Sequence, residues 1–336
     1  MTNEYSTSNN LRCKKPLSIL RYINYNFLIF FSNKNFIVHK EVNICSGIDR
    51  SVRFIGSHTS VLKNYMIDST LPDQGFAINQ DCFKAKNLRF IDKDDQDLKV
   101  PSFFPCNGIL LKYEYAPRAI DYLLEFFIHF LGINARSLEV LVNSDDRDLI
   151  DTFAKSGYLI TLRPDTLIKE KYVHQKFGVE NMSGRDCTIA LKNSSSTGSV
   201  AAITIIEINK VPRFIEITIS PLKIISQLYN YSSVFYCYLP SSYLEYDISQ
   251  PFIKTIDCLI SVTALFKYGL KPSNKDNRTR LFMKYIKYLQ QQVNKSNLNI
   301  SELCFIQNHF EHEYFQYSER VTSKIISSIL GNNHEN

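Results

Sequence analysis

The chain has 336 residues, of which 44% are hydrophobic and 21% are charged, and its formal net charge is +6. This length is sufficient for one large domain or two modest domains with their own cores. The charge permits a polyanionic partner without requiring one, because strong nucleic-acid binders usually gather their basic residues on one face. The longest apolar stretches, residues 22–31 and 122–133, are interrupted by polar residues and fall short of the roughly 18–20 residues of a membrane span. Residues 1–10 lack the pattern of a secretory signal, so we expect a cytoplasmic protein without a transmembrane segment.

The cysteines and histidines do not form a recognisable metal-binding pattern. The eight cysteines are scattered without a CxxC pair, which favours buried, reduced thiols. His309, Glu311, His312 and Glu313 form an H-x-E-H cluster, but its spacing differs from the HExxH motif of zinc enzymes. A solvated helix face is the favoured interpretation, and we assign no metal ligands.

Hydrophobic periodicity in the first half of the chain predicts alternating helices and strands. We treat residues 1–20, a polar tail with a short basic patch, as an accessory segment. Beyond it the pattern predicts a helix at 19–31, strands at 36–42, 75–84 and 107–115, a helix at 119–131, a strand at 137–142 and a helix at 145–155. The acidic run 92–97 is a loop by composition, so the strands on either side of it form a long-looped hairpin.

The second half changes from strands to helices. Strands are predicted at 188–192, 200–208 and 214–219, with a turn-rich linker at 193–199, and helices at 259–268, 280–293 and 321–330. Tyr- and Ser-rich sequence interrupts the pattern at 229–250, where we place a domain boundary. The expected fold is α+β: an antiparallel sheet flanked by helices at 21–228, followed by a mainly helical domain at 229–336.

Several segments resemble, in order and spacing, the catalytic core of alanyl-tRNA synthetase, a class II aminoacyl-tRNA synthetase. The resemblance runs from about residue 23 to about residue 290 and rests on divergent motifs. Gln80-Asp-Cys-Phe-Lys84 resembles the family's Q-x-C-[IV]-R, Ser102-Phe-Phe-Pro-Cys-Asn-Gly108 resembles T-F-F-E-M-L-G, Glu216-Ile-Thr-Ile-Ser-Pro-Leu-Lys223 resembles D-T-G-M-G-L-E-R, and the segment that ends in Pro272-Ser-Asn274 resembles one that ends in P-S-N. Phe27 to Phe36, Phe54 to Lys63 and Gly184 to Thr188 resemble further family segments.

This resemblance implies a class II fold that binds ATP with Mg²⁺, activates an amino acid as its adenylate, and transfers it to tRNA or another acceptor. The matching positions imply that Lys84 and Lys223 are catalytic and ATP-binding residues, where the family has two arginines. Glu216 would bind the amino group of the amino acid. Asn274 would contact the tRNA acceptor stem, together with three basic residues that follow it, namely Arg278, Lys284 and Lys287.

The substitutions within these motifs change the expected chemistry. Lysine keeps the positive charge of arginine but lacks its planar fork and most of its stacking ability. Pro105 and Pro221 each remove a backbone N–H that a ligand could use. Glu216 could instead be a charge on an exposed strand, and the basic stretch around Lys284 a solvated helix face.

Three functions stay open at the level of the sequence. The chain is an ATP-dependent amino-acid-activating ligase, a catalytically inactive pseudo-synthetase that binds tRNA, an amino acid or a protein, or an α+β protein with a coincidental likeness. The sequence does not specify the amino acid, the acceptor or the oligomeric state.

Overall fold

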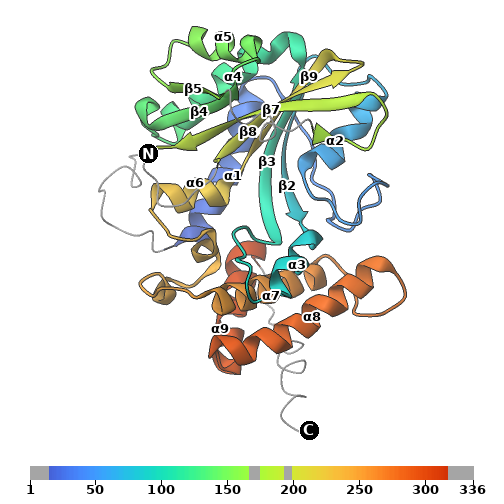
Figure 1. The fold of residues 1–336 in the computed structure, drawn as a ribbon, viewed down its shortest axis with the longest axis vertical. Coiled ribbons are helices and arrows are strands. Elements are labelled where there is room, and N and C mark those ends of the chain that lie inside the picture. The colour runs from blue at the N-terminus through green and yellow to red at the C-terminus, as the bar shows by residue number, and fades with distance from the viewer. Residues whose placement is uncertain (1–14, 166–174, 193–198, 317–336) are drawn as a thin grey trace.

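A largely antiparallel sheet forms the centre of the molecule. The computed structural model describes residues 15–165, 175–192 and 199–316 (Figure 1). Within them the strand order is β1-β2-β3-β9-β8-β7-β4-β5, with β6 paired to β7, and only the β1–β2 and β4–β5 pairs are parallel. The strands are β1 (Ile37–Val38), β2 (Phe76–Phe83), β3 (Phe103–Lys112), β4 (Leu138–Asn143), β5 (Thr161–Asp165), β6 (Gln175–Lys176), β7 (Met182–Leu191), β8 (Ala201–Ile208) and β9 (Val211–Ile219).

Helices cover both faces of this sheet. Residues of α1 and α4 share one hydrophobic cluster with Ile109 and Ile217, whereas residues of α2 share a second cluster with Ile78 and Leu110, on the opposite face. The helices of this part are α1 (Pro16–Asn33), α2 (His58–Ile67), α3 (Leu88–Ile91), α4 (Ala116–Glu125, continued by a π-helical turn at Phe126–Phe130), α5 (Arg147–Lys155) and α6 (Pro221–Leu228). The α+β class with helices flanking an antiparallel sheet is therefore confirmed.

The central strand β3 is buried along nearly its whole length because helices cover both faces of the sheet. It begins at Phe103, earlier than the predicted start at residue 107. Proline usually argues against a central strand, since it cannot donate to the ladder. Pro105 is accommodated because it pairs with Asp81 of β2, while the pairing of β3 with β9 starts only at Asn107. The predicted strand at 36–42, in contrast, is reduced to the two residues of β1.

The remaining helices form a group at the end of the sheet near β2 and β3, as Figure 1 shows. They are α7 (Gln250–Lys267), α8 (Asn277–Ser296) and α9 (Ile300–Phe315). Helix α7 begins earlier than predicted because Ser249 caps it, its side chain accepting a hydrogen bond from the N–H of Phe252. Asp276 and Thr279 form a capping box at the start of α8. The mainly helical character of this segment is confirmed, while the predicted helix at 321–330 lies outside the described residues.

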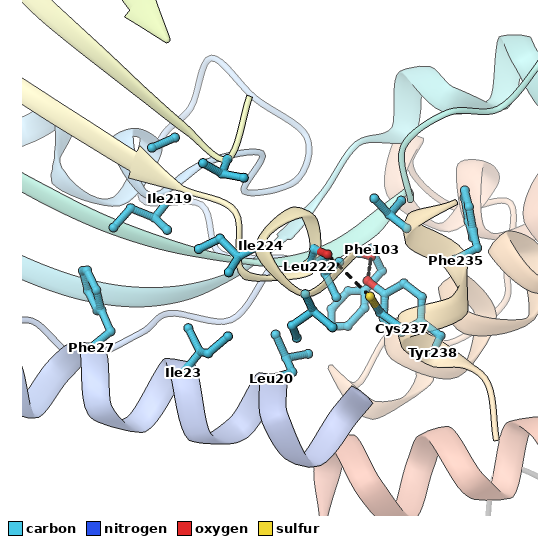
Figure 2. Packing of buried hydrophobic residues seen from close by; sticks show 14 of the residues in the cluster. Leu20, Ile23, Phe27, Phe103, Ile219, Leu222, Ile224, Phe235, Cys237 and Tyr238 are labelled. Atoms are coloured by element: carbon cyan, nitrogen blue, oxygen red, sulfur yellow. Dashed lines mark hydrogen bonds between the residues drawn. The ribbon is translucent and has the colours of Figure 1, made fainter. Parts of the chain in front are cut away.

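The packing of α1 fixes the turn between β9 and α6. Figure 2 shows Leu20, Ile23 and Phe27 of α1 facing a group that includes Ile219 at the end of β9 and Ile224 of α6. These side chains belong to one buried cluster that also includes residues of the C-terminal helices. Burial of apolar surface contributes about 25 cal/mol per Å², and the surface shared by these side chains holds α1 against the turn between β9 and α6. The first turn of α6, which carries one of the predicted site residues, therefore has a rigid support.

Two further predictions concern membranes and thiols. No helix in the described ranges is both long and apolar enough to cross a membrane. None of the cysteines in the described part of the chain forms a disulfide; Cys45 and Cys304 are partly exposed, and five others are buried: Cys82, Cys106, Cys187, Cys237 and Cys258.

Candidate functional site

A cavity of about 170 Å³ lies on the face of the sheet that α2 partly covers. Phe104 and Cys106 of β3 and Thr218 of β9 line it, and the register of the strands puts these three side chains on one face. Lys84, directly after β2, and Lys223, in the first turn of α6, line it as well. The described residues around the cavity thus include two cations and no carboxylate.

The charged forms of both cavity lysines are disfavoured by their surroundings. Burial lowers the pKa of Lys84, and repulsion from Lys86 adds to the effect. Burial also lowers the pKa of Lys223, with repulsion from Lys84 as the second cause. The ammonium group of Lys84 lies 4.7 Å from the centroid of the Phe104 ring, which supplies a cation–π contact. An anion bound between the two lysines would relieve their repulsion, so the cavity suits a phosphate or a carboxylate.

The N-terminus of α6 adds hydrogen-bond donors to the same cavity. Ser220 is its N-cap residue and Pro221 occupies the first helical turn. The first N–H groups of a helix have no intrahelical acceptor and carry a partial positive charge, which favours anions. Proline at this position costs the helix nothing, because its missing N–H would have had no partner within the helix. The N–H groups of Leu222 and Lys223, both residues of the cavity wall, follow it.

A buried cluster of titratable groups adjoins the cavity. The Nδ1 atom of His58 lies 3.5 Å from the thiol sulfur of Cys106, and its Nε2 atom lies 2.9 Å from Oε1 of Glu216. The hydroxyl of Thr59 donates a hydrogen bond to the same carboxylate oxygen. His58 is 0% exposed and Glu216 is 2% exposed. His58 therefore bridges a cysteine and a carboxylate in the protein interior.

Gly108 makes room for the imidazole ring of His58. A Cβ atom at this position would lie 2.2 Å from the ring, far inside van der Waals contact. Glycine is thus required here for the close approach of α2 to β3 and not for its backbone freedom. The ring packs directly against the backbone of Gly108, between α2 and β3.

The charges of this cluster depend on one another. Burial alone would lower the pKa of His58, but the carboxylate of Glu216 and the thiol of Cys106 raise it far above its usual value. A hydrogen bond with Cys82 lowers the pKa of Cys106, burial opposes this effect, and the charge of His58 lowers the pKa further. The neighbouring carboxylate and thiol outweigh desolvation for His58, and the hydrogen bond with Cys82 together with the charge of His58 outweighs it for Cys106. The cluster therefore favours a thiolate at Cys106 and an imidazolium at His58.

The predicted site residues fall into two places. Lys84 and Lys223 come together in the wall of one cavity. Glu216 lies on the same face but beyond His58, and its burial excludes the alternative of a charge on an exposed strand. His58, Thr59 and Cys106 were not predicted as site residues, because the family segments that they lie in assign them no role.

The predicted tRNA-contacting residues lie apart from this cavity, at the start of α8 and along it. Asn274, Lys284 and Lys287 are exposed. The guanidinium of Arg278 donates hydrogen bonds to the backbone carbonyls of Arg53 and Ser46, the latter at 3.2 Å. Arg278 thereby ties α8 to the loop before α2.

The cavity fits the phosphate part of the expected cofactor better than its metal. Two cations and a helix N-terminus complement phosphate oxygens. Mg²⁺ prefers oxygen ligands in octahedral geometry, frequently with one or two protein carboxylates. The described part of the chain has no group of three metal-binding side chains that could hold an ion. Any Mg²⁺ would therefore be held mainly by the phosphates and water.

Comparisons with known proteins give only distant likenesses. No protein-family model matches the chain, and no curated protein matches it in sequence. Among solved structures, the chain is similar to a pyrrolysyl-tRNA synthetase of Desulfitobacterium hafniense (8% identity, TM-score 0.40, 64% of this chain and 70% of the other). It is also similar to a protein described as a threonyl-tRNA synthetase of Aeropyrum pernix (10% identity, TM-score 0.41, 63% and 60%). A third similar structure is S. aureus histidyl-tRNA synthetase (9% identity, TM-score 0.41, 84% of this chain and 89% of the other).

Proposed function

We propose that the chain is an ATP-dependent ligase that activates an amino acid as an aminoacyl adenylate, in the manner of alanyl-tRNA synthetase. The observation that carries this proposal is the pair of lysines on one cavity with no acidic residue in its described wall. Two half-buried cations that repel each other are costly unless an anion compensates them. The same two lysines stand at the positions of two arginines in the motifs of alanyl-tRNA synthetase that the sequence resembles.

In this function the lysines stabilise charge on the phosphates. Lys84 neutralises the α-phosphate as the carboxylate of the amino acid attacks it, and Lys223 with the N-terminus of α6 binds the leaving pyrophosphate or the adenylate. Such a reaction depends on positioning and charge stabilisation more than on a protein nucleophile. Mg²⁺ bound by the phosphates would supply additional charge neutralisation.

The acceptor and the amino acid are further parts of the proposal. Glu216 would bind the amino group, sharing its carboxylate with His58. The exposed Asn274, Lys284 and Lys287 would contact an RNA acceptor stem, the lysines through phosphates and the asparagine through a base edge. Arg278 would act indirectly, because it already binds two backbone carbonyls.

A second function is favoured by a specific contact. His58 and Thr59 already occupy one oxygen of Glu216, so the protein itself supplies the cation that an amino-acid substrate would supply. A protein that has lost activation would keep the cavity and bind a nucleotide, an RNA or a partner without turnover. This is the pseudo-synthetase alternative.

Pyrophosphate exchange and ATP titration separate the two functions. The ligase predicts exchange of pyrophosphate into ATP with one amino acid out of a full panel, in the presence of Mg²⁺. Lys84→Ala and Lys223→Ala should each weaken ATP binding about 10-fold or more, since a hydrogen bond to a charged group contributes about 1.5–3 kcal/mol. Lys287→Ala is the matched control, because its exposed side chain lies on α8 and should leave ATP binding unchanged.

The outcomes are distinct. ATP binding that depends on both lysines, without exchange for any amino acid, supports the pseudo-synthetase. ATP binding that is absent, or unaffected by both substitutions, would rule out the cavity as a nucleotide site.

A further inference from the structure

Cys106, His58 and Glu216 lie in the order of a nucleophile, its base and a carboxylate that forms an ion pair with the base. We propose that Cys106 accepts an acyl group from an acyl phosphate bound in the cavity and forms a thioester, with His58 as its base. An acyl phosphate would be formed in the cavity only if the proposed ligase function is correct, so this part of the inference rests on the proposed function. The reactivity of the Cys106 thiol does not depend on it. The chemical class of the substrate is a mixed anhydride of a carboxylic acid and a phosphate.

The first support is the position of Cys106 between the cavity and His58. Cys106 lines the same cavity as Lys84 and Lys223, and its sulfur lies 3.5 Å from Nδ1 of His58. A nucleophile within reach of a base, with the base held by a third group, is the recurring signature of covalent catalysis. The two lysines would hold the phosphate of an acyl phosphate beside this sulfur.

The second support is the rigid placement of His58. The ring lies against Gly108, and its Nε2 atom faces Glu216 at 2.9 Å, while the hydroxyl of Thr59 fixes the carboxylate. A carboxylate on the far nitrogen orients the ring and stabilises its charged form. Glu216 is thus a positioning residue for the acyl transfer.

The third support is the contrast with Cys258, which is buried in α7. Burial raises the pKa of the Cys258 thiol well above its usual value, with the charge of Asp257 as a further cause. This is the behaviour expected of a structural cysteine, because the thiolate is disfavoured in apolar surroundings. Cys106 is equally buried, but its hydrogen bond with Cys82 and, after it, the charge of His58 lower the pKa of its thiol.

The reaction balances without an oxidant or a reductant. In the thiolate–imidazolium pair the proton of Cys106 already lies on Nδ1 of His58, and the thiolate attacks the carbonyl carbon of the acyl phosphate. A C–S bond forms, and the bond between the carbonyl carbon and the phosphate oxygen breaks. The electron pair leaves with the phosphate, which becomes AMP when the donor is an acyl adenylate. Lys84 and Lys223 would stabilise the negative charge on this leaving group.

The first experiment measures the thiol itself. The folded protein is treated with iodoacetamide between about pH 6 and pH 9, and modification of each cysteine is followed by peptide mass spectrometry. Cys106 should react at neutral pH, where an ordinary thiol with a pKa of about 8.5 is only slightly ionised. His58→Gln should lower the rate at pH 7 about 10-fold and restore it at higher pH, and Glu216→Gln should have a smaller effect in the same direction. Cys258→Ser is the control that should leave the Cys106 rate unchanged.

The second experiment uses acetyl phosphate as the donor, so that no ATP-dependent step is needed. Cys106 should gain an acetyl group that neutral hydroxylamine removes, and Cys106→Ala should not be acetylated at the corresponding peptide. Lys84→Ala should slow acetyl transfer more than it slows iodoacetamide modification, because iodoacetamide has no phosphate for Lys84 to bind while Lys84 favours the Cys106 thiolate in both reactions.

The two proposals can fail separately. Acetyl transfer to Cys106 without pyrophosphate exchange would support the acyl acceptor and contradict the ligase. Exchange without any acylation of Cys106 in the folded, unmutated protein would overturn the acyl acceptor and leave the ligase standing.

Discussion

Strand β3 is flanked by two buried polar networks that differ in what surrounds them. Just before the strand, the N–H of Ser102 donates to Oδ1 of Asp257 at 2.6 Å and its hydroxyl donates to Oδ2 at 2.5 Å. The hydroxyl of Tyr285 then donates to the Ser102 hydroxyl at 2.9 Å. Farther along the strand, Cys106 faces His58 and Glu216.

The difference between these networks shows that burial and a shifted pKa do not by themselves mark a site. Burial raises the pKa of Asp257 to about 7, a shift as strong as many at active sites. Ser102, Asp257 and Tyr285 are not residues of the cavity wall, and their hydrogen bonds join β3 to α7 and α8. Cys106 lines a cavity with two cations. We therefore interpret the first network as structural and the second as functional.

Asp257→Ala gives the largest expected effect on stability. It leaves the N–H and the hydroxyl of Ser102 without their acceptor, and each unsatisfied buried donor costs about 1–3 kcal/mol, so the free energy of unfolding should fall by about 4 kcal/mol. Chemical denaturation measures the change. Ser261→Ala on the same helix is a matched control, because its buried hydroxyl oxygen has no hydrogen-bond partner among the described residues, and it should be neutral or stabilising. A loss of Cys106 reactivity in folded Asp257→Ala protein would contradict the separation of the two networks.

Sequence periodicity predicted most of the strands and the helices α1, α4, α5, α7 and α8, because their burial follows simple repeats, whereas α2, α6 and α9 were not predicted. β4 alternates between buried and partly buried residues, and α4 has a proline in its first turn and one buried stripe. Two strand boundaries were predicted wrongly. The alternating pattern predicted a strand longer than β1, and Pro105 argued against a strand at the true start of β3. Tertiary pairing with β2 determines both outcomes.

The site could be predicted only in part. Lys84 and Lys223 were found because each lies within a motif, and both line the cavity. His58, Cys106 and Glu216 come from α2, β3 and β9, and no local spacing records that the fold brings them together. The sequence indicated a charge at Glu216, but it did not indicate the internal partner that compensates it.

The pH dependence of stability tests the electrostatics of the first network. The folded-state pKa of Asp257 is raised from 3.8 to about 7, so its protonated form is the one that folding favours. Its contribution is fully present below the unfolded pKa and is lost as the pH rises through the folded pKa. Between about pH 5 and pH 7 the carboxyl is mostly protonated in the folded state and ionised in the unfolded state. When the two states differ by one bound proton, the free energy of unfolding changes by about 1.4 kcal/mol per pH unit. Between about pH 5 and pH 7, Asp257 alone should therefore lower the free energy of unfolding by about 2 kcal/mol.

Denaturant titrations at several pH values, compared with Asp257→Asn, isolate that contribution. The asparagine variant should lack this part of the pH dependence while other buried carboxyls, such as Asp81, keep theirs. Identical pH profiles for the two proteins would mean that Asp257 is ionised throughout this range and that its hydrogen bonds outweigh its burial.

Lys223→Met has the smallest expected effect on stability, and the opposite sign. Burial and then Lys84 lower the pKa of Lys223, so its charged form costs folding free energy. Methionine has a similar length and fills irregular space well, so the variant should be about 0.5–1 kcal/mol more stable while it binds ATP or inorganic phosphate less tightly. Lys287→Met on the exposed face of α8 should change stability by no more than about 0.5 kcal/mol. A gain in stability joined to a loss of anion binding is expected only where a charge is kept for a ligand. If Lys223→Met destabilised the protein instead, Lys223 would be a structural residue like Asp257. Its charge would then no longer support a phosphate site in the cavity.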